Sequence, residues 1–410
     1  MFLRLLILAI ALAGLVLYTV LGGADFGAGL WQLSAGWGER GREIRDQAHR
    51  SIAPVWEANH VWLVFVLTVL WTGYPAFFGS VFSTLAVPLF LALLGIILRG
   101  LSYALHTATD VPRERRVIDT AFSLSSIVTP FMLGVCVGAI ASGRVPVGNA
   151  AGGLWSSWTN SVSLLSGFMA VSTGAFLAAI YLAADARRSP VAGLDDAFRR
   201  RALDAAVATG ILALAALGVA HDDAPSLFHG LTRGLGLAAV IISALAGLIS
   251  ITLVSRRRYA VARLAAVAAV AALLCGWAAA QRPYLLPGLT VSAAAADTTT
   301  LVALLVAVII GGAILFPSLF FLFRLSLSGR LLPDRRGPKP HTAGVDARRP
   351  AWAGRAALGC FVAGAVLLIF ADDDAGHVVG VVAFAVAAVL GFTAVGPDQL
   401  AAQEPDRPGV

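Results

Sequence analysis

The stretch GGADFGAGLW, residues 22–31, places an aspartate among glycines at the end of a long hydrophobic run. The run from Phe2 to Leu21 is almost wholly apolar, and no turn signal separates it from Asp25. An ionisable side chain at membrane depth is costly, so its presence there predicts a functional site by default. The stretch therefore predicts a membrane helix with a special polar face.

The glycines of this stretch follow helical spacing. Gly22, Asp25 and Gly29 share one face at i, i+3 and i+7, and Gly23 and Gly27 form a GxxxG pair. Faces of small residues let neighbouring helices approach closely. Both faces are therefore predicted to meet other helices and to avoid lipid.

The composition is that of a polytopic membrane protein. Hydrophobic residues make up 58% of the 410 residues, charged residues 13%, and the mean hydropathy is +0.83. The net charge of +7 comes from arginines in short clusters between apolar runs, with Lys339 the only lysine. Such clusters indicate topology signals and no binding of nucleic acid. Cys136, Cys275 and Cys360 lie in apolar runs without CxxC or CxxCH spacing, which predicts packing residues and no covalent haem.

Hydrophobic stretches predict eleven membrane helices. Nine form a body over residues 1–328, near 2–33, 56–79, 80–106, 118–142, 160–184, 201–220, 234–255, 260–280 and 298–326. The first is predicted to be a retained helix and not a signal peptide, and Asp297 is predicted to cap the ninth. A Pro/Arg-rich linker at 329–352, an extra transmembrane hairpin at 353–396 and a tail at 397–410 are predicted to follow.

The basic residues predict the orientation. Segments after helices 1, 3, 5, 7 and 9 carry 24 Lys and Arg, whereas the opposite side carries four, Arg4, Arg144, Arg233 and Arg282. The positive-inside rule therefore predicts an outside N-terminus, a cytoplasmic linker and a cytoplasmic C-terminus. Arg99 is the exception, because it falls inside the third helix.

Polar residues of three helices are predicted to meet in one layer. Asp25 and Arg99 each follow the start of parallel helices by about 20 residues, which places them at similar depth toward the cytoplasmic side. The second helix returns from that side and opens with PVWEANHVWL, which adds Glu57, Asn59 and His60. Arg99 would cost roughly 2.5 to 3.5 kcal/mol at the bilayer centre, which favours a buried carboxylate partner.

Structural explanations also exist for these residues. Glu57 follows Pro54 in the first helical turn, where the helix dipole favours an acid. His60 lies three residues further and can be the hydrogen-bond partner of Glu57, and Asp25 can reach the headgroup level. For haem, the seven histidines fall in loops or at helix ends, and only Met132 and Met169 lie inside spans. The sequence therefore predicts no haem bound by standard ligands.

Taken together, these stretches resemble subunit II of the cytochrome bd-type quinol oxidases. The matching pieces are GGADFGAGLW, RSIAPVWEANHVWL at 50–63, ILRGLSYALH at 97–106, SIVTPFMLGVCVG at 126–138, and the weaker RPYLLPG with ADTTT. The resemblance implies an all-α body of two four-helix bundles plus a peripheral helix, without haem, in the bacterial plasma membrane. It also implies a partner subunit I that carries b and d haems and oxidises quinol, in a complex that reduces oxygen with cytoplasmic protons.

The resemblance also implies roles for individual residues. Glu57 matches the family's acid with a role in proton transfer, with Asn59 and His60 beside it, and Asp25 and Arg99 match its structural pair. The chain has Glu where many members have Asp, His60 where Gln is common, and a longer C-terminus, which leaves the docking of a small single-helix subunit open. It is thus expected to be a subunit of an electrogenic respiratory oxidase, not catalytic alone.

Two alternatives remain open. A secondary transporter would use the same polar layer as an ion or substrate site, and its expected sign, matched broken helices in two halves, is not evident in the sequence. A haem-free structural scaffold would share the family but give Glu57 no chemical role.

Overall fold

The computed structural model describes residues 1–327, except 37, 53–55 and 107–111, together with short helical pieces between 356 and 390. The chain divides into two compact units, Met1–Leu322 and Phe323–Val410. In the described residues the fold is all-α apart from one two-stranded hairpin, which confirms the predicted class. The linker at 329–352 lies outside the described residues, as does most of the hairpin at 353–396, so both stay predictions.

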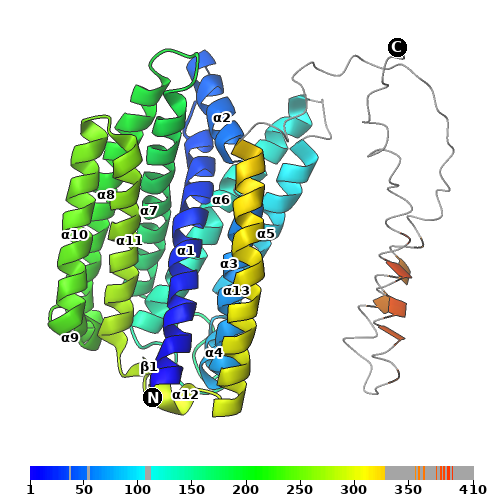
Figure 1. The fold of residues 1–410 in the computed structure, drawn as a ribbon, viewed down its shortest axis with the longest axis vertical. Helices are drawn as coiled ribbons and strands as arrows, with labels where there is room; N and C mark the ends of the chain where they lie inside the picture. The colour runs from blue at the N-terminus through cyan, green and yellow to red at the C-terminus, as the bar shows by residue number, and fades with distance from the viewer. Residues whose placement is uncertain are drawn as a thin grey trace. The chain divides into compact units, whose positions relative to one another are not determined.

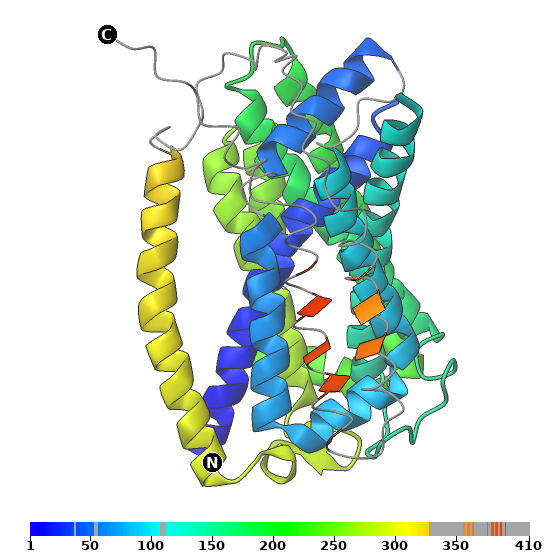
Figure 2. The ribbon, with the colours of Figure 1, turned by 90° about the vertical axis from the view of Figure 1, so that its right-hand side faces the viewer.

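Two four-helix bundles stand side by side (Figure 1). The first contains α1 (Phe2–Leu33), α3 (Trp56–Gly73), α5 (Ala86–His106) and α6 (Pro112–Ala141). The second contains α7 (Ser161–Ala186), α8 (Leu194–Asp223), α10 (Gly234–Ser255) and α11 (Tyr259–Gln281). A further long helix, α13 (Thr298–Leu327), stands at the edge of the first bundle (Figure 2). The predicted architecture of two bundles plus a peripheral helix is therefore confirmed.

The bundles meet where α1 crosses α7 with the two backbones in contact. A Cβ atom added to Gly27 would overlap the backbone of Gly174, and Gly23 faces the same glycine. The Trp31 side chain donates a hydrogen bond from Nε1 to the Ala175 carbonyl at 2.9 Å. The GxxxG face of α1 thus forms the contact between the bundles, as close helix packing requires.

Each bundle contains the same sharp turn after its second long helix. A short helix, α4 (Pro75–Thr84), follows α3, and α9 (Pro225–Leu231) follows α8. The linking residues have nearly equal backbone angles, φ −140° and ψ 60° at Tyr74 and φ −144° and ψ 64° at Ala224. Proline lacks an N–H and disfavours helical angles in the residue before it, so both helices stop there. The bundles are therefore a structural repeat.

The predicted boundary between the second and third spans, at residues 79 and 80, is wrong. The chain bends by 120° between α3 and α4, and the next membrane helix begins only at Ala86. Apolar residues continue through α4, so hydropathy carries no signal for the turn, whereas Pro75 does. Both short helices, α4 and α9, lie at the same end of the bundles as the N-terminus (Figure 1).

The connections contain further regular elements. The basic segment after α1 forms α2 (Glu39–Ile52), and a hairpin of β1 (Tyr284–Leu286) and β2 (Leu289–Thr290) leads into α12 (Val291–Ala294). Asp297 caps α13 as predicted, because its Oδ1 accepts a hydrogen bond from the Thr300 N–H at 2.9 Å. This backbone hydrogen bond lowers the pKa of Asp297.

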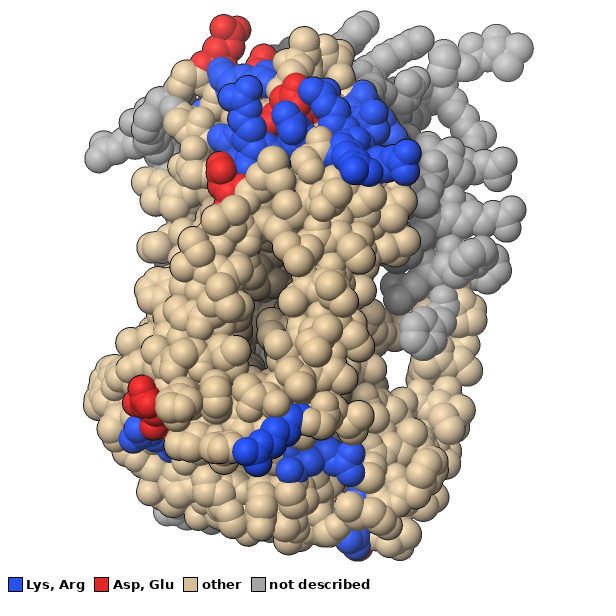
Figure 3. Space-filling model, turned by 90° about the vertical axis from the view of Figure 1, so that its left-hand side faces the viewer, with Lys and Arg blue, Asp and Glu red and all other residues tan. Residues whose placement is uncertain are grey.

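The described helices fit a membrane. Seven are long and apolar enough to cross it, and α3 with α4 forms an eighth, bent candidate. Lys and Arg gather at the end of the molecule that faces away from the N-terminus, and an almost uncharged band separates them from a few charges at the other end (Figure 3). The chain is therefore a multi-pass membrane protein with one strongly basic end.

We predict that this basic end faces the cytoplasm. Ser226 in α9 and Ser189 after α7 lie at opposite ends of the second bundle. In intact cells, a membrane-impermeant maleimide should label a Ser226→Cys variant, and it should label Ser189→Cys only after permeabilisation. The chain without an added cysteine controls for its native thiols. Labelling of Ser189→Cys in intact cells would contradict the orientation.

Candidate functional site

A buried ion pair joins α1 to α5. The Arg99 guanidinium bonds the Asp25 carboxylate through Nη2, which also donates to the Asp25 backbone carbonyl at 3.0 Å. The side chains are 2% and 0% exposed, respectively. The structure thus brings together the two charged residues that the sequence places at similar depth.

Side chains of α1 and α6 hold the two terminal nitrogens of the Arg99 guanidinium and flank it with aromatic rings. Its Nη1 donates a hydrogen bond to the Ser126 hydroxyl, which in turn donates to the Phe122 carbonyl at 2.6 Å. The Arg99 Cζ atom lies 5.0 Å from the centre of the Phe26 ring and 4.2 Å from that of Phe122. Aromatic faces attract a cation, and more strongly where water is absent. These contacts fix the arginine in one geometry.

Glycines on α1 make room for this site. A Cβ atom at Gly29 would overlap the Ser126 side chain and lie 3.2 Å from Arg99 Nη1. One at Gly22 would lie 3.0 Å from the Asn59 side-chain nitrogen. The face that carries Asp25 therefore contacts α3, α5 and α6, whereas the GxxxG face contacts α7. Both faces meet other helices, as predicted.

The second helix of the bundle brings Asn59 into the same layer. Its side chain is fully buried against Gly22, and neither Oδ1 nor Nδ2 has a hydrogen-bond partner among the described residues. One oxygen of Asp25 and the Nε of Arg99 are likewise buried without such a partner. Buried polar atoms are normally satisfied by protein or by water. This layer therefore contains more buried polar atoms than the described contacts within it satisfy.

The remaining predicted residues lie at the start of α3. Glu57 occupies its first turn, but the side chain of Glu57 lies outside the described residues. His60 is half-buried one turn further along. The structure thus shows Asp25, Arg99 and Asn59 gathered in one buried layer, and it places Glu57 and His60 in the helix that delivers Asn59.

Sequence reasoning missed the contribution of α6. Ser126 and Phe122 hold Arg99, and Ser123, Ser125 and Thr129 are buried on the same helix. The signal was present, because hydroxyl residues recur through 123–129 inside an apolar span. Small hydroxyl residues in membrane helices often bond neighbouring helices, and their clustering could have identified α6 as the third wall of the site.

The described residues place few candidate ligands for haem iron inside the membrane-spanning part of the bundles. His221 and His229 lie at the end of the second bundle that carries α9, where they are exposed and bond Asp222 and the Pro225 carbonyl, respectively. Met132 and Met169 are half-buried in α6 and α7. Among the described residues, no three His, Cys, Asp or Glu side chains form a metal-binding group. Among the described side chains of the polar layer, His60 is the one residue of a type that serves as an axial haem ligand.

Comparisons with known proteins agree with this architecture. The sequence profile of the family described as cytochrome bd terminal oxidase subunit II matches residues 3–326. A solved chain of the bd oxidase from Geobacillus thermodenitrificans superposes with a TM-score of 0.66 at 26% identity, covering 80% of this chain and 99% of that one.

Curated relatives bear related names. A Bacillus subtilis protein described as a cytochrome bd menaquinol oxidase subunit II is 25% identical over 325 residues, which cover 75% of this chain and 91% of the relative. The similarity to cytochrome bd-I ubiquinol oxidase subunit 2 of Escherichia coli K12 is 28% over 129 residues. That alignment spans about a third of the relative. The alignment with cytochrome bd ubiquinol oxidase subunit 2 of Bacillus subtilis also spans about a third of that protein. With its profile match and shared fold, the chain belongs to the cytochrome bd terminal oxidase subunit II family.

Proposed function

We propose that the chain is the haem-free second subunit of a membrane-bound quinol:oxygen oxidoreductase. In this role it supports a haem-bearing subunit I and helps to deliver cytoplasmic protons for the reduction of oxygen to water. The family supports the complex, and the names of the relatives support quinol as its substrate. A small single-helix subunit is the further partner that the proposal includes.

The buried polar layer carries this proposal. Proton delivery through a membrane subunit needs a titratable group near the cytoplasmic side and polar groups leading inward from it. Glu57 in the first turn of α3 supplies the carboxyl, and Asn59, two residues further, has buried polar atoms without a hydrogen-bond partner among the described residues. The Asp25–Arg99 pair contributes a fixed, neutral anchor beside them.

The transporter alternative is less well supported. Matched helix breaks do occur, at Tyr74 and Ala224, so they were missed in the sequence. Transporter sites use breaks near the middle of the membrane, where helix ends face the substrate. Here both breaks lie at the end of the bundles that carries the N-terminus, away from the basic end and α2 (Figure 1). The breaks therefore serve as turns between spans.

The proposal predicts that the full chain, expressed without its partner, binds no haem. The physical reason is the lack of a pair of axial ligands at depth. Absorbance of the purified chain should show no Soret band, whereas the complete complex purified in parallel should show one. A stoichiometric Soret band from the chain alone would contradict a haem-free subunit.

A second prediction concerns the ion pair. Removing one member of a buried pair costs about 3 to 5 kcal/mol in soluble proteins, because the other charge is left unpaired. Arg99→Leu should therefore reduce the amount of assembled complex several-fold, measured as haem per milligram of membrane protein. Adding Asp25→Asn should restore part of it. Arg144→Leu, at an exposed arginine, is the control and should assemble normally. Equal loss in the single and double variants would show that charge pairing is not the cause.

A third prediction tests proton delivery directly. Glu57→Gln keeps the side-chain shape but cannot release a proton, so the complex should retain its haems and turn over at least several-fold more slowly. Glu57→Asp should recover much of the rate, because the carboxyl survives. Quinol-driven oxygen uptake per haem is the measurement, and Glu39→Gln, an exposed acid in the first turn of α2, is the matched control. Full activity in Glu57→Gln would remove this residue from proton transfer and favour a scaffold.

A further inference from the structure

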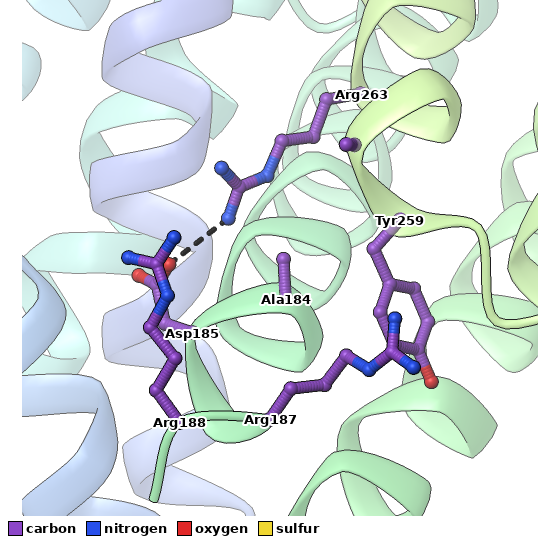
Figure 4. Close-up of a pocket in the computed structure, with 7 residues that line it drawn as sticks. Ala184, Asp185, Arg187, Arg188, Tyr259 and Arg263 are labelled. Atoms are coloured by element: carbon purple, nitrogen blue, oxygen red, sulfur yellow. Dashed lines mark hydrogen bonds and ion pairs between the residues drawn. The ribbon is translucent and has the colours of Figure 1, made fainter.

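A separate charged cavity lies at the basic end of the second bundle. It has a volume of about 340 Å³ and opens between the end of α7 and the start of α11 (Figure 4). Its lining residues are Ala184, Asp185, Arg187, Arg188, Tyr259, Ala260 and Arg263. Three arginines against one aspartate give the lining an excess of positive charge. This composition favours an anionic ligand.

Arg263 is held at the wall of this cavity by α7. Its Nη2 donates to Asp185 Oδ1 at 3.0 Å and to the Tyr181 carbonyl at 2.9 Å. Its Cζ lies 4.5 Å from the centre of the Tyr181 ring. The side chain remains 27% exposed, so the guanidinium is positioned but still accessible. A prepositioned arginine loses little conformational entropy when it binds an anion.

Arg187 is positioned on the opposite wall. It donates a hydrogen bond from Nη1 to the Arg257 carbonyl at 3.2 Å, and its Cζ lies 5.7 Å from the centre of the Tyr259 ring. Figure 4 shows this guanidinium beside Tyr259, whereas those of Arg188 and Arg263 lie on the side of Asp185. Cationic groups therefore flank the opening from two sides.

Two donors on the cavity have no competing partner. The exposed Arg188 makes no side-chain hydrogen bond or ion pair with the described residues, so its guanidinium is free to turn toward a ligand. The N-cap residue of α11, Arg258, provides no side-chain hydrogen bond to the first turn, and Ala260 of that turn lines the cavity. Uncapped N–H groups at a helix N-terminus attract anions such as phosphate.

The surface next to the cavity is apolar and exposed. Val261 and Leu264, on the same stretch of α11, are 54% and 71% exposed. In a membrane protein such side chains contact acyl chains, and Ala260, which lines the cavity, directly precedes Val261 on α11. A ligand that joins an anionic head to apolar chains matches both surfaces, and basic pockets between helices suit lipid phosphates.

We propose that this cavity binds the phosphate headgroup of an anionic phospholipid. Arg187, Arg188 and Arg263 bind the phosphate oxygens, and the acyl chains lie along the exposed face of α11. Asp185 holds Arg263 in place but also opposes the ligand's charge. The site lies in the second bundle and is independent of the proton-delivery role proposed for the first.

Native mass spectrometry of the full chain, purified in detergent with the subunits that accompany it, tests this proposal. The probes are phosphatidylglycerol, phosphatidylcholine with the same acyl chains, and inorganic phosphate. Phosphatidylglycerol should bind best. Arg188→Gln should weaken its binding about fivefold, as expected for one arginine near a lipid surface. Because Arg188 has no side-chain partner in the described structure, this change leaves the fold intact.

Two further variants make the test specific. Asp185→Asn removes the opposing charge and should strengthen the binding of phosphatidylglycerol several-fold, which a misfolded protein would not do. The control is Arg200→Gln with Arg256→Gln, two exposed arginines at the same end that do not line the cavity. This control should bind the lipid as the unchanged protein does.

Three results would overturn the proposal. Equal weakening in the control pair would mean that the basic end attracts lipid without a site. Equal binding of phosphatidylcholine would mean that the headgroup charge is not recognised. Displacement of the lipid by inorganic phosphate at equal concentration would mean that the cavity is a site for a free anion and the acyl chains contribute nothing.

Discussion

A guanidinium buried inside the bundle needs a partner there, and this need shapes the first half of the protein. The side chain of Arg99 is almost fully buried. Asp25 neutralises it, while Ser126 and two aromatic rings surround the rest of the group. Gly29 is required because any side chain there would occupy the space of Ser126. One buried cation thus constrains α1, α5 and α6 together.

The second bundle repeats the fold of the first, so the two bundles can be compared with and without the buried Asp25–Arg99 pair. Both bundles use the same proline-directed turn and the same order of helices. When Phe26 of α1 is matched with Phe176 of α7, Ala175 takes the place of Asp25, and α10 carries no charged residue at all. The second bundle therefore reaches the same architecture without a buried ion pair. This supports a purpose for the polar layer that goes beyond holding four helices together.

Much of the fold could be predicted because hydrophobic length and charge are strong signals in membranes. The long helices, their order and the meeting of Asp25 with Arg99 followed from run lengths, direction and depth. The turn at Tyr74 did not, because α4 is as apolar as the helix before it and only Pro75 marks the change. The role of Ser126 was equally hidden. A serine has no strong preference for one site, and its importance depends on which helix lies opposite.

The separation of Asp25 and Arg99 along the chain also has a consequence for synthesis. The two residues are 74 positions apart, so at 5 to 20 residues per second the acid leaves the ribosome roughly 4 to 15 seconds before its partner. During this interval α1 is in the membrane without Arg99, so the buried ion pair cannot form until α5 has followed. The order of synthesis thus makes closure of the first bundle wait for its third long helix, however early the first one is inserted.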